Sequence, residues 1–209
     1  TDVRAYLKGL NLPYANERLA IISSDGNLWL SYGKGVFCYD FKNKSCKRIS
    51  IPAHSGNILA LQSNGNDVFV VTPNNIFCIA THKNNVENVV KTPHPLTNDH
   101  FIILRDKVHN MWLAAGNHLY RLDNDSKEWI DINNVHNVKS IVTTRSAYTF
   151  VATTNNGLYI FSPNSEELTN FTQAPPNTEG LLTNHIEKLY YSTSRSEECR
   201  VGKECRSRW

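Results

Sequence analysis

Several features are missing from this 209-residue sequence, and each absence narrows what the chain can be. No apolar run is long enough to cross a membrane as a helix, which excludes a helical membrane span. No signal peptide is present either. The chain opens on Thr1 rather than Met, so we expect its true N-terminus to be missing. The lack of a signal peptide therefore carries no information about the compartment.

The residue patterns that carry catalysis or hold a metal are also absent. There is no Gly-x-Ser-x-Gly elbow, no His-Glu-x-x-His motif and no phosphate-binding loop. The eight histidines are scattered, and no two of them stand at metal-ligand spacing. We therefore predict a non-catalytic chain with no cofactor and no metal.

The C-terminal segment 195–209 differs from the rest, because it is rich in charge and has no alternating pattern. Its first residues, Arg195-Ser196-Glu197-Glu198, are those that the sequencing-adapter bases AGATCGGAAGAG encode. We interpret the segment as a translated adapter and hence as non-native. The alternatives are a charged, disordered tail or, less favoured, a basic arm for nucleic acid.

Cysteine and net charge are both low once segment 195–209 is set apart. Cys38, Cys46 and Cys78 remain, an odd number that provides no disulfide framework. Cys38 and Cys78 occupy the same place in two similar segments, so we expect both to be small buried apolar residues. Without the segment the net charge falls from +3 to +1, which argues against binding nucleic acid.

What the sequence does contain is one unit repeated four times. The first occurrence, residues 25–40, reads as a turn, an alternating strand, a glycine-rich turn and a second strand. Degenerate copies occupy 66–78, 108–123 and 147–160, and 108–123 is the clearest of them. The central aromatic residues of the copies follow one another at steps of 40, 43 and 38 residues; they are Trp29, Phe69, Trp112 and Phe150. A period near forty with several short strands per repeat is typical of propeller blades.

We therefore predict an all-β chain, an incomplete β-propeller with four four-stranded antiparallel blades plus the first strand of a fifth. The propeller is expected to occupy residues 1–194, and its blades are expected at 17–52, 57–92, 100–133 and 137–172, with the next starting in 180–193. The innermost strands of these blades carry apolar residues on both faces, as strands between neighbouring blades should; they are 18–24, 58–62, 101–105, 138–143 and 186–191. Four blades cannot close a larger ring, so we expect the remaining blades in a longer parent chain.

The repeat resembles the regulator-propeller repeat of bacterial hybrid two-component sensors. The matching residues are Gly9, Leu10, Asp25, Gly26, Asn27, Leu28, Trp29, Gly35, Val36, Tyr39 and Asp40 in the first repeat, Asn110, Trp112, Leu119, Tyr120, Arg121 and Asp123 in the third, and Gly157, Leu158 and Tyr159 in the fourth. Segment 180–186 matches the opening of a further repeat. The sequence departs from the family pattern where Phe69 and Phe150 replace Trp and where Ser31-Tyr32 replaces Gly-Thr.

The resemblance implies the periplasmic, ligand-sensing propeller of a two-component sensor histidine kinase, with an oligosaccharide as the expected ligand. Its partners would be a small-molecule or oligosaccharide ligand, the other propeller blades and, in some assemblies, a second copy in a homodimer. We expect no nucleic acid and no direct membrane contact in this segment. The alternatives are a propeller that serves as a protein-interaction or dimerisation scaffold and, third, a propeller lyase or hydrolase.

One set of polar residues is predicted to form the binding site, because each crossover enters an innermost strand at the same end of the propeller. Loops on a rigid scaffold are where binding sites usually form. The candidate ligand-binding residues are Asn57, Asp99, His100, His136, Asn137, Asn184 and His185, with turn residues Lys34, Asn74, Asn117 and Asn156 beside them. The alternative is that these residues only cap strands and close turns.

The aromatic column is assigned a different role. We predict that Trp29, Phe69, Trp112 and Phe150 pack between adjacent blades. The alternative is that one of them forms a platform on which a sugar stacks.

Overall fold

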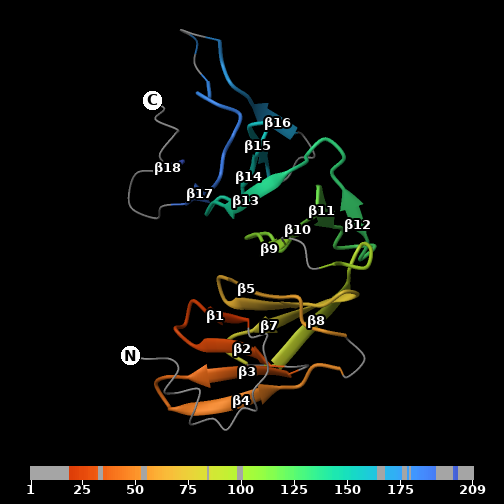
Figure 1. Cartoon of the computed structure of the whole chain (residues 1–209), viewed down its shortest axis with the longest axis vertical. Helices are drawn as coiled ribbons and strands as arrows, with labels where there is room; N and C mark the ends of the chain where they lie inside the picture. The colour runs from red at the N-terminus through yellow and green to blue at the C-terminus, as the bar shows by residue number, and fades with distance from the viewer. Residues whose placement is uncertain are drawn as a thin grey trace. The chain divides into compact units, whose positions relative to one another are not determined.

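The computed structural model describes residues 19–32, 35–52, 56–83, 85–97, 101–163, 168–175, 178, 180–191 and 200–201. The chain divides into two compact units, Thr1–Asn98 and Asp99–Trp209. Every regular element of the described part is a β-strand (Figure 1). Within that part, no helix is long and apolar enough to cross a membrane.

The first unit contains two four-stranded antiparallel sheets, each a simple meander in which consecutive strands pair. One sheet is formed by β1 (Ala20–Ile22), β2 (Leu28–Tyr32), β3 (Gly35–Asp40) and β4 (Ser45–Ile49). The other is formed by β5 (Ala60–Asn64), β6 (Asp67–Val71), β7 (Asn75–Ala80) and β8 (Asn85–Lys91). Figure 1 shows both sheets in red to yellow-green. They are the first two predicted blades.

The first turn of the repeat explains why Asp25-Gly26-Asn27 is present in the sequence. The chain reverses there through Gly26, whose φ is 84°, a value that glycine adopts without strain. The amide of Gly26 donates to the carbonyl of Ser23, and the amide of Ser23 donates to the carbonyl of Asn27. These bonds close the turn between β1 and β2.

The core of the first unit lies between its two sheets. Trp29, Val36, Cys38 and Ile49 of one sheet pack with Leu61, Val68, Val70, Phe77 and Ile79 of the other. The indole N–H of Trp29, fully buried, donates to Ser23 Oγ at 2.9 Å. Phe69 is also fully buried, on the face of β6 opposite to Val68 and Val70.

The cysteines behave as the sequence predicts. Cys38 and Cys78 are buried, Cys46 is exposed, and none of the three is in a disulfide. Burial raises the pKa of the Cys38 thiol to about 12, so this group stays protonated and acts as a small apolar residue.

The second unit repeats the same plan. Its two four-stranded sheets comprise β9 (Phe101–Arg105), β10 (Met111–Ala115), β11 (His118–Leu122) and β12 (Trp129–Asp131), and β13 (Val138–Thr143), β14 (Thr149–Thr153), β15 (Leu158–Phe161) and β16 (Leu168–Phe171). Short β17 (Leu189–Tyr190) follows and pairs with β18 (Arg200–Val201). The sheets appear in green to blue in Figure 1.

Two apolar cores organise the second unit. In one, Trp112, Leu104 and Leu119 of the first sheet pack with residues such as Val151 and Phe161 of the second. The Trp112 and Phe161 rings lie 4.8 Å apart between centroids. In the other core, Phe150 lies partly buried against a group formed by Ala152, Leu158, Ile186 and Leu189. Trp29, Trp112 and Phe150, the central aromatic residues of three blades, thus each pack in a core shared with the strands that follow their own blade along the chain.

The predicted fold class, an incomplete β-propeller of four four-stranded blades followed by a further strand, is confirmed. Two details differ from prediction. The first innermost strand does not bury both faces, since Ile22 is 67% exposed. The strand expected at 186–191 is only the two-residue β17. In segment 195–209 the structure describes Arg200 and Val201, which form β18, so its assignment as a non-native or disordered tail remains a prediction.

Candidate functional site

Crossovers and turns meet at one edge of the second unit, as the sequence predicts for a propeller end. The loop after β12 brings His136 and Asn137 against the turn between β10 and β11, where Asn117 lies. His136 Nδ1 lies 3.1 Å from the carbonyl oxygen of Asn117. The amide of Asn137 donates to Asn117 Oδ1 at 3.0 Å.

Asn137 joins the two blades of the second unit at this edge. Its φ of 55° lies in the left-handed region, which asparagine tolerates better than most residues. Its carbonyl accepts a bond from the amide of Thr154, at the turn after β14. The backbone of Asn137 is therefore held between two turns, and its side chain is exposed.

Two further side chains complete this group and were not on the predicted list. His118 begins β11 and Asp131 ends β12, and His118 Nδ1 lies 3.0 Å from Asp131 Oδ2. The His118 ring stacks on Tyr120 and meets the His136 ring edge-on, with centroids 5.8 Å and 6.1 Å apart. We call Asn117, His118, Asp131, His136 and Asn137 the His136 cluster.

The electrostatics of the His136 cluster centre on Asp131. Burial raises the pKa of the Tyr120 phenol, and the charge of Asp131 raises it further. The side chain of Asp131 is 32% exposed, yet its Oδ1 atom is buried and has no hydrogen-bond partner among the described residues. A carboxylate oxygen in this position can accept a hydrogen bond from a bound molecule.

A similar junction lies where the chain passes from β16 to β17. His185 Nδ1 lies 3.2 Å from the carbonyl oxygen of Thr154, and His185 Nε2 lies 2.6 Å from Glu187 Oε1. The Asn184 side chain accepts a bond from the Gln173 amide, and the Asn184 carbonyl accepts one from the Gly157 amide. Asn184 therefore fastens the loop, whereas His185 remains 46% exposed.

The remaining predicted residues are less informative. Asn57 is exposed in the first unit, after Gly56, which lies beside the Pro73 ring. Asp99, His100 and Lys34 lie outside the described residues. The structure brings His136, Asn137 and Asn117 together, and it places His185 and Asn184 at the neighbouring junction. Whether any of them binds a ligand stays a prediction.

A partial signal for the missed residues was present in the sequence. His118 follows Asn117, and strand alternation puts it one position beyond the turn. Asp131 becomes its neighbour only because β11 and β12 pair with Tyr120 opposite Asp131. No group of three or more His, Cys, Asp or Glu residues suited to a metal is found in the described part of the chain.

Successive four-stranded antiparallel meanders, packed face to face within each unit and joined by crossovers at one edge, define a β-propeller segment. A family profile matches residues 11–191, and the chain belongs to that family, which is described as Domain of unknown function (DUF5074). No curated protein matches the sequence.

Solved structures of the same fold are numerous. The extracellular domain of the putative hybrid two component system BT4673 from B. thetaiotaomicron has a TM-score of 0.52 and 16% identity, over 82% of this chain and 24% of that one. PorZ of the type-IX secretion system of Porphyromonas gingivalis has a TM-score of 0.53 and 17% identity, over 86% of this chain and 30% of that one.

A third structure of the same fold is an enzyme. Virginiamycin B lyase from Staphylococcus aureus, in a catalytically inactive form, has a TM-score of 0.53 and 14% identity, over 85% of this chain and 60% of that one. This chain spans about a quarter of the length of the BT4673 domain. At these identities the likeness shows the fold alone.

Proposed function

We propose that this chain is part of the extracytoplasmic, ligand-sensing propeller of a two-component sensor, and that it takes part in binding an oligosaccharide. The observation that carries the proposal is the His136 cluster. Three segments of chain converge there to present polar side chains at one edge of a rigid β-scaffold. The likeness in fold to the extracellular domain of a hybrid two component system supports the same function.

The chemistry of the cluster suits a hydroxylated ligand. When Nδ1 of His136 donates to the Asn117 carbonyl, Nε2 of the neutral ring is left as an acceptor. Asp131 Oδ1 is an acceptor that has no hydrogen-bond partner among the described residues. The side-chain amide of Asn137 is exposed and can both donate and accept. Sugar hydroxyls donate and accept in the same way. A periplasmic location follows from this proposal rather than from the segment itself.

The test is calorimetry on the full chain with hexasaccharides from arabinan, xylan and mannan. A net hydrogen bond contributes about 0.5–1.5 kcal/mol, so His136→Ala or Asn137→Ala should weaken binding about threefold to tenfold. His82→Ala is the matched control, since His82 is an exposed histidine in the turn between β7 and β8. Unchanged affinity after alanine replaces His136, Asn137 and His185 together would place the site elsewhere.

The scaffold alternative predicts a different result. No oligosaccharide would bind, and the parent gene would carry neither a membrane span nor a kinase core beyond this segment. Reading the gene downstream separates the two hypotheses directly.

An enzymatic alternative is favoured by one observation, the pairing of His118 with Asp131, since a carboxylate orients a histidine for proton transfer. A lyase would release an unsaturated product from one of the oligosaccharides. Ultraviolet absorbance of the incubated hexasaccharides would detect it.

A further inference from the structure

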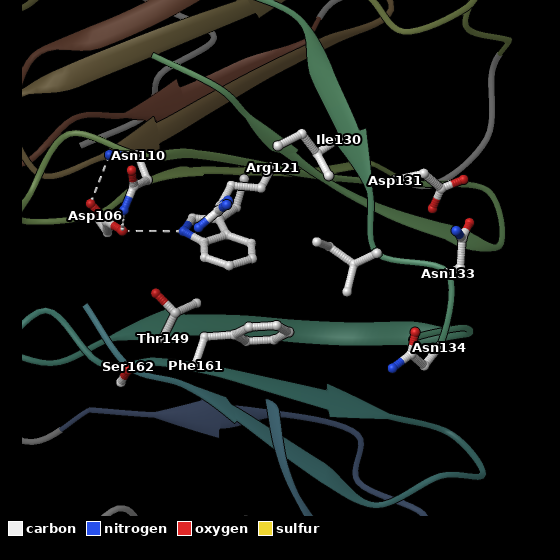
Figure 2. Close-up of a pocket in the computed structure, with 12 residues that line it drawn as sticks. Asp106, Asn110, Arg121, Ile130, Asp131, Asn133, Asn134, Thr149, Phe161 and Ser162 are labelled. Atoms are coloured by element: carbon white, nitrogen blue, oxygen red, sulfur yellow. Dashed lines mark hydrogen bonds between the residues drawn. The ribbon is translucent and has the colours of Figure 1, made fainter. Parts of the chain in front are cut away.

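A cavity of about 270 Å³ lies between the two blades of the second unit, and Asp131 of the His136 cluster is among the residues that line it. Figure 2 shows Arg121 and Ile130 on one wall and Thr149 and Phe161 on the other. The indole of Trp112 also lines the space. The volume is close to the lower end of the range of small-molecule pockets, about 300 Å³.

The wall at the Asp106 end is held rigidly. The Asp106 carboxylate accepts four hydrogen bonds, from the amides of Val108 and Asn110, from Asn110 Nδ2 and from Trp112 Nε1, at 2.8–3.2 Å. Figure 2 shows the bonds to Asn110 and to the indole as dashed lines. Because four donors bond to the Asp106 carboxylate, this side chain is fixed, and its bond to Trp112 Nε1 fixes the indole ring at the cavity wall.

Thr149 is the unusual residue of the opposite wall. Its side chain is 1% exposed, and Oγ1 has no hydrogen-bond partner among the described residues. A buried hydroxyl without a partner lowers stability, and such groups are uncommon in folded proteins. Thr153 lies on the same strand and is fully buried too, but its hydroxyl donates to the Gly157 carbonyl and accepts from the Asn156 amide. The unpaired state of Thr149 is therefore a property of its position beside the cavity.

Three charged side chains line the cavity, the carboxylates of Asp106 and Asp131 and the guanidinium of Arg121. An anionic ligand would meet two carboxylates of like charge. A neutral ligand does not meet this penalty. The apolar faces of Ile130, Trp112 and Phe161 favour a molecule with a C–H surface.

We propose that this cavity binds a small neutral molecule with several hydroxyl groups, the size of a single sugar ring, which pairs with the Thr149 hydroxyl. A hydroxyl group both donates and accepts, so it satisfies Thr149 in either orientation. The ring face packs against the aromatic wall. Asp131 belongs both to the cavity lining and to the His136 cluster, but the pairing with Thr149 does not depend on the oligosaccharide site proposed above.

The experiment uses the full chain, with D-glucose, D-galactose, L-arabinose and myo-inositol as probes and with gluconate as an anionic comparator. Binding is followed by saturation-transfer NMR and calorimetry. At least one neutral probe should bind, and gluconate should bind more weakly. The Thr149→Val variant, which replaces the hydroxyl with a methyl group, should lose about tenfold or more in affinity.

Thr153→Val is the matched control. In the ligand-free chain Thr149→Val should hold or raise the Tm, by up to about 2–4 °C, because it removes an unpaired hydroxyl. Thr153→Val should lower the Tm by a similar amount and leave probe affinity unchanged, because it breaks two existing bonds.

Three results would overturn the proposal: no neutral probe binds, Thr149→Val binds as tightly as the original chain, or Thr149→Val lowers the Tm as Thr153→Val does. The first would mean that the cavity holds only water, and the second would mean that the bound probe does not pair with the Thr149 hydroxyl. The third would mean that the Thr149 hydroxyl already has a partner. Alanine at His136 and Asn137 should not affect these probes, which keeps this test distinct from that of the oligosaccharide site.

Discussion

The burial of Trp29 leads to a quantitative prediction about the first unit. The side chain is fully buried between two sheets, and its N–H donates to Ser23 Oγ at 2.9 Å. Replacement by alanine leaves a cavity among Val36, Leu61 and their neighbours in the same core. Large-to-small changes of this kind cost about 3–5 kcal/mol of unfolding free energy. Because domains are stable by only about 5–15 kcal/mol, Trp29→Ala should remove a large share of the stability.

A second substitution separates packing from hydrogen bonding. Trp29→Phe keeps an aromatic ring but loses the N–H donor. The Ser23 hydroxyl still lies within hydrogen-bond distance of Asp25 Oδ1 and of the Asn27 carbonyl oxygen, so it is not left alone. The expected cost is about 1–2 kcal/mol, from one net hydrogen bond and some lost ring area.

The assay is urea unfolding followed by far-ultraviolet circular dichroism, with Ile22→Ala as the control. Ile22 belongs to the same blade but is 67% exposed, so its truncation should cost less than about 1 kcal/mol. The reasoning is refuted if Trp29→Ala costs no more than Ile22→Ala. An equal cost for Trp29→Phe and Trp29→Ala would show that the hydrogen bond, rather than the packing, dominates.

Two further predictions concern a turn and acid stability. Gly157→Ala should lower the Tm much more than Gly116→Ala. Both glycines have positive φ, 75° and 57°, but a Cβ at position 157 would lie 2.2 Å from the Phe171 carbonyl oxygen, whereas one at 116 meets no atom within 4 Å. Equal shifts in thermal melts would contradict the clash. Hydrogen bonds from the Asn43 amide and side chain lower the pKa of Asp40, and the Asp125 amide and the Ser126 hydroxyl do the same for Asp123. Because the folded state favours these ionised carboxylates, their stabilisation is present above about pH 4 and is lost as the pH falls through the lowered values. The double variant Asp40→Asn, Asp123→Asn should therefore lose less Tm than the original chain between neutral and acid pH, and parallel curves would disprove this.

Several parts of the fold could be predicted because they depend on neighbouring residues. Leu28, Trp29 and Leu30 alternate in β2, the strand expected after the first turn of the repeat, and Gly26 takes the positive φ that its turn requires. The repeat spacing then gives the number of blades. Ile22 was predicted to be buried and is exposed, because burial depends on what covers a strand rather than on its own sequence.

The candidate site, too, could be predicted from the sequence only in part. The crossover residues His136 and Asn137 were predicted from the connectivity of a propeller, and the structure places them beside Asn117. Asp131 and His118 were missed, because thirteen positions separate them and only the register of β11 against β12 brings their side chains within hydrogen-bond distance.

By itself the sequence determined the period, the strands and the class of fold, since alternation and turn residues act over a few positions. The tertiary structure decided which polar groups are left without partners. Thr149 and Thr153 are the same residue type on one strand and are both buried, yet only Thr153 finds hydrogen-bond partners among the described residues. That difference arises from packing between blades, where the Gly157 turn comes close to Thr153 while a cavity lies beside Thr149.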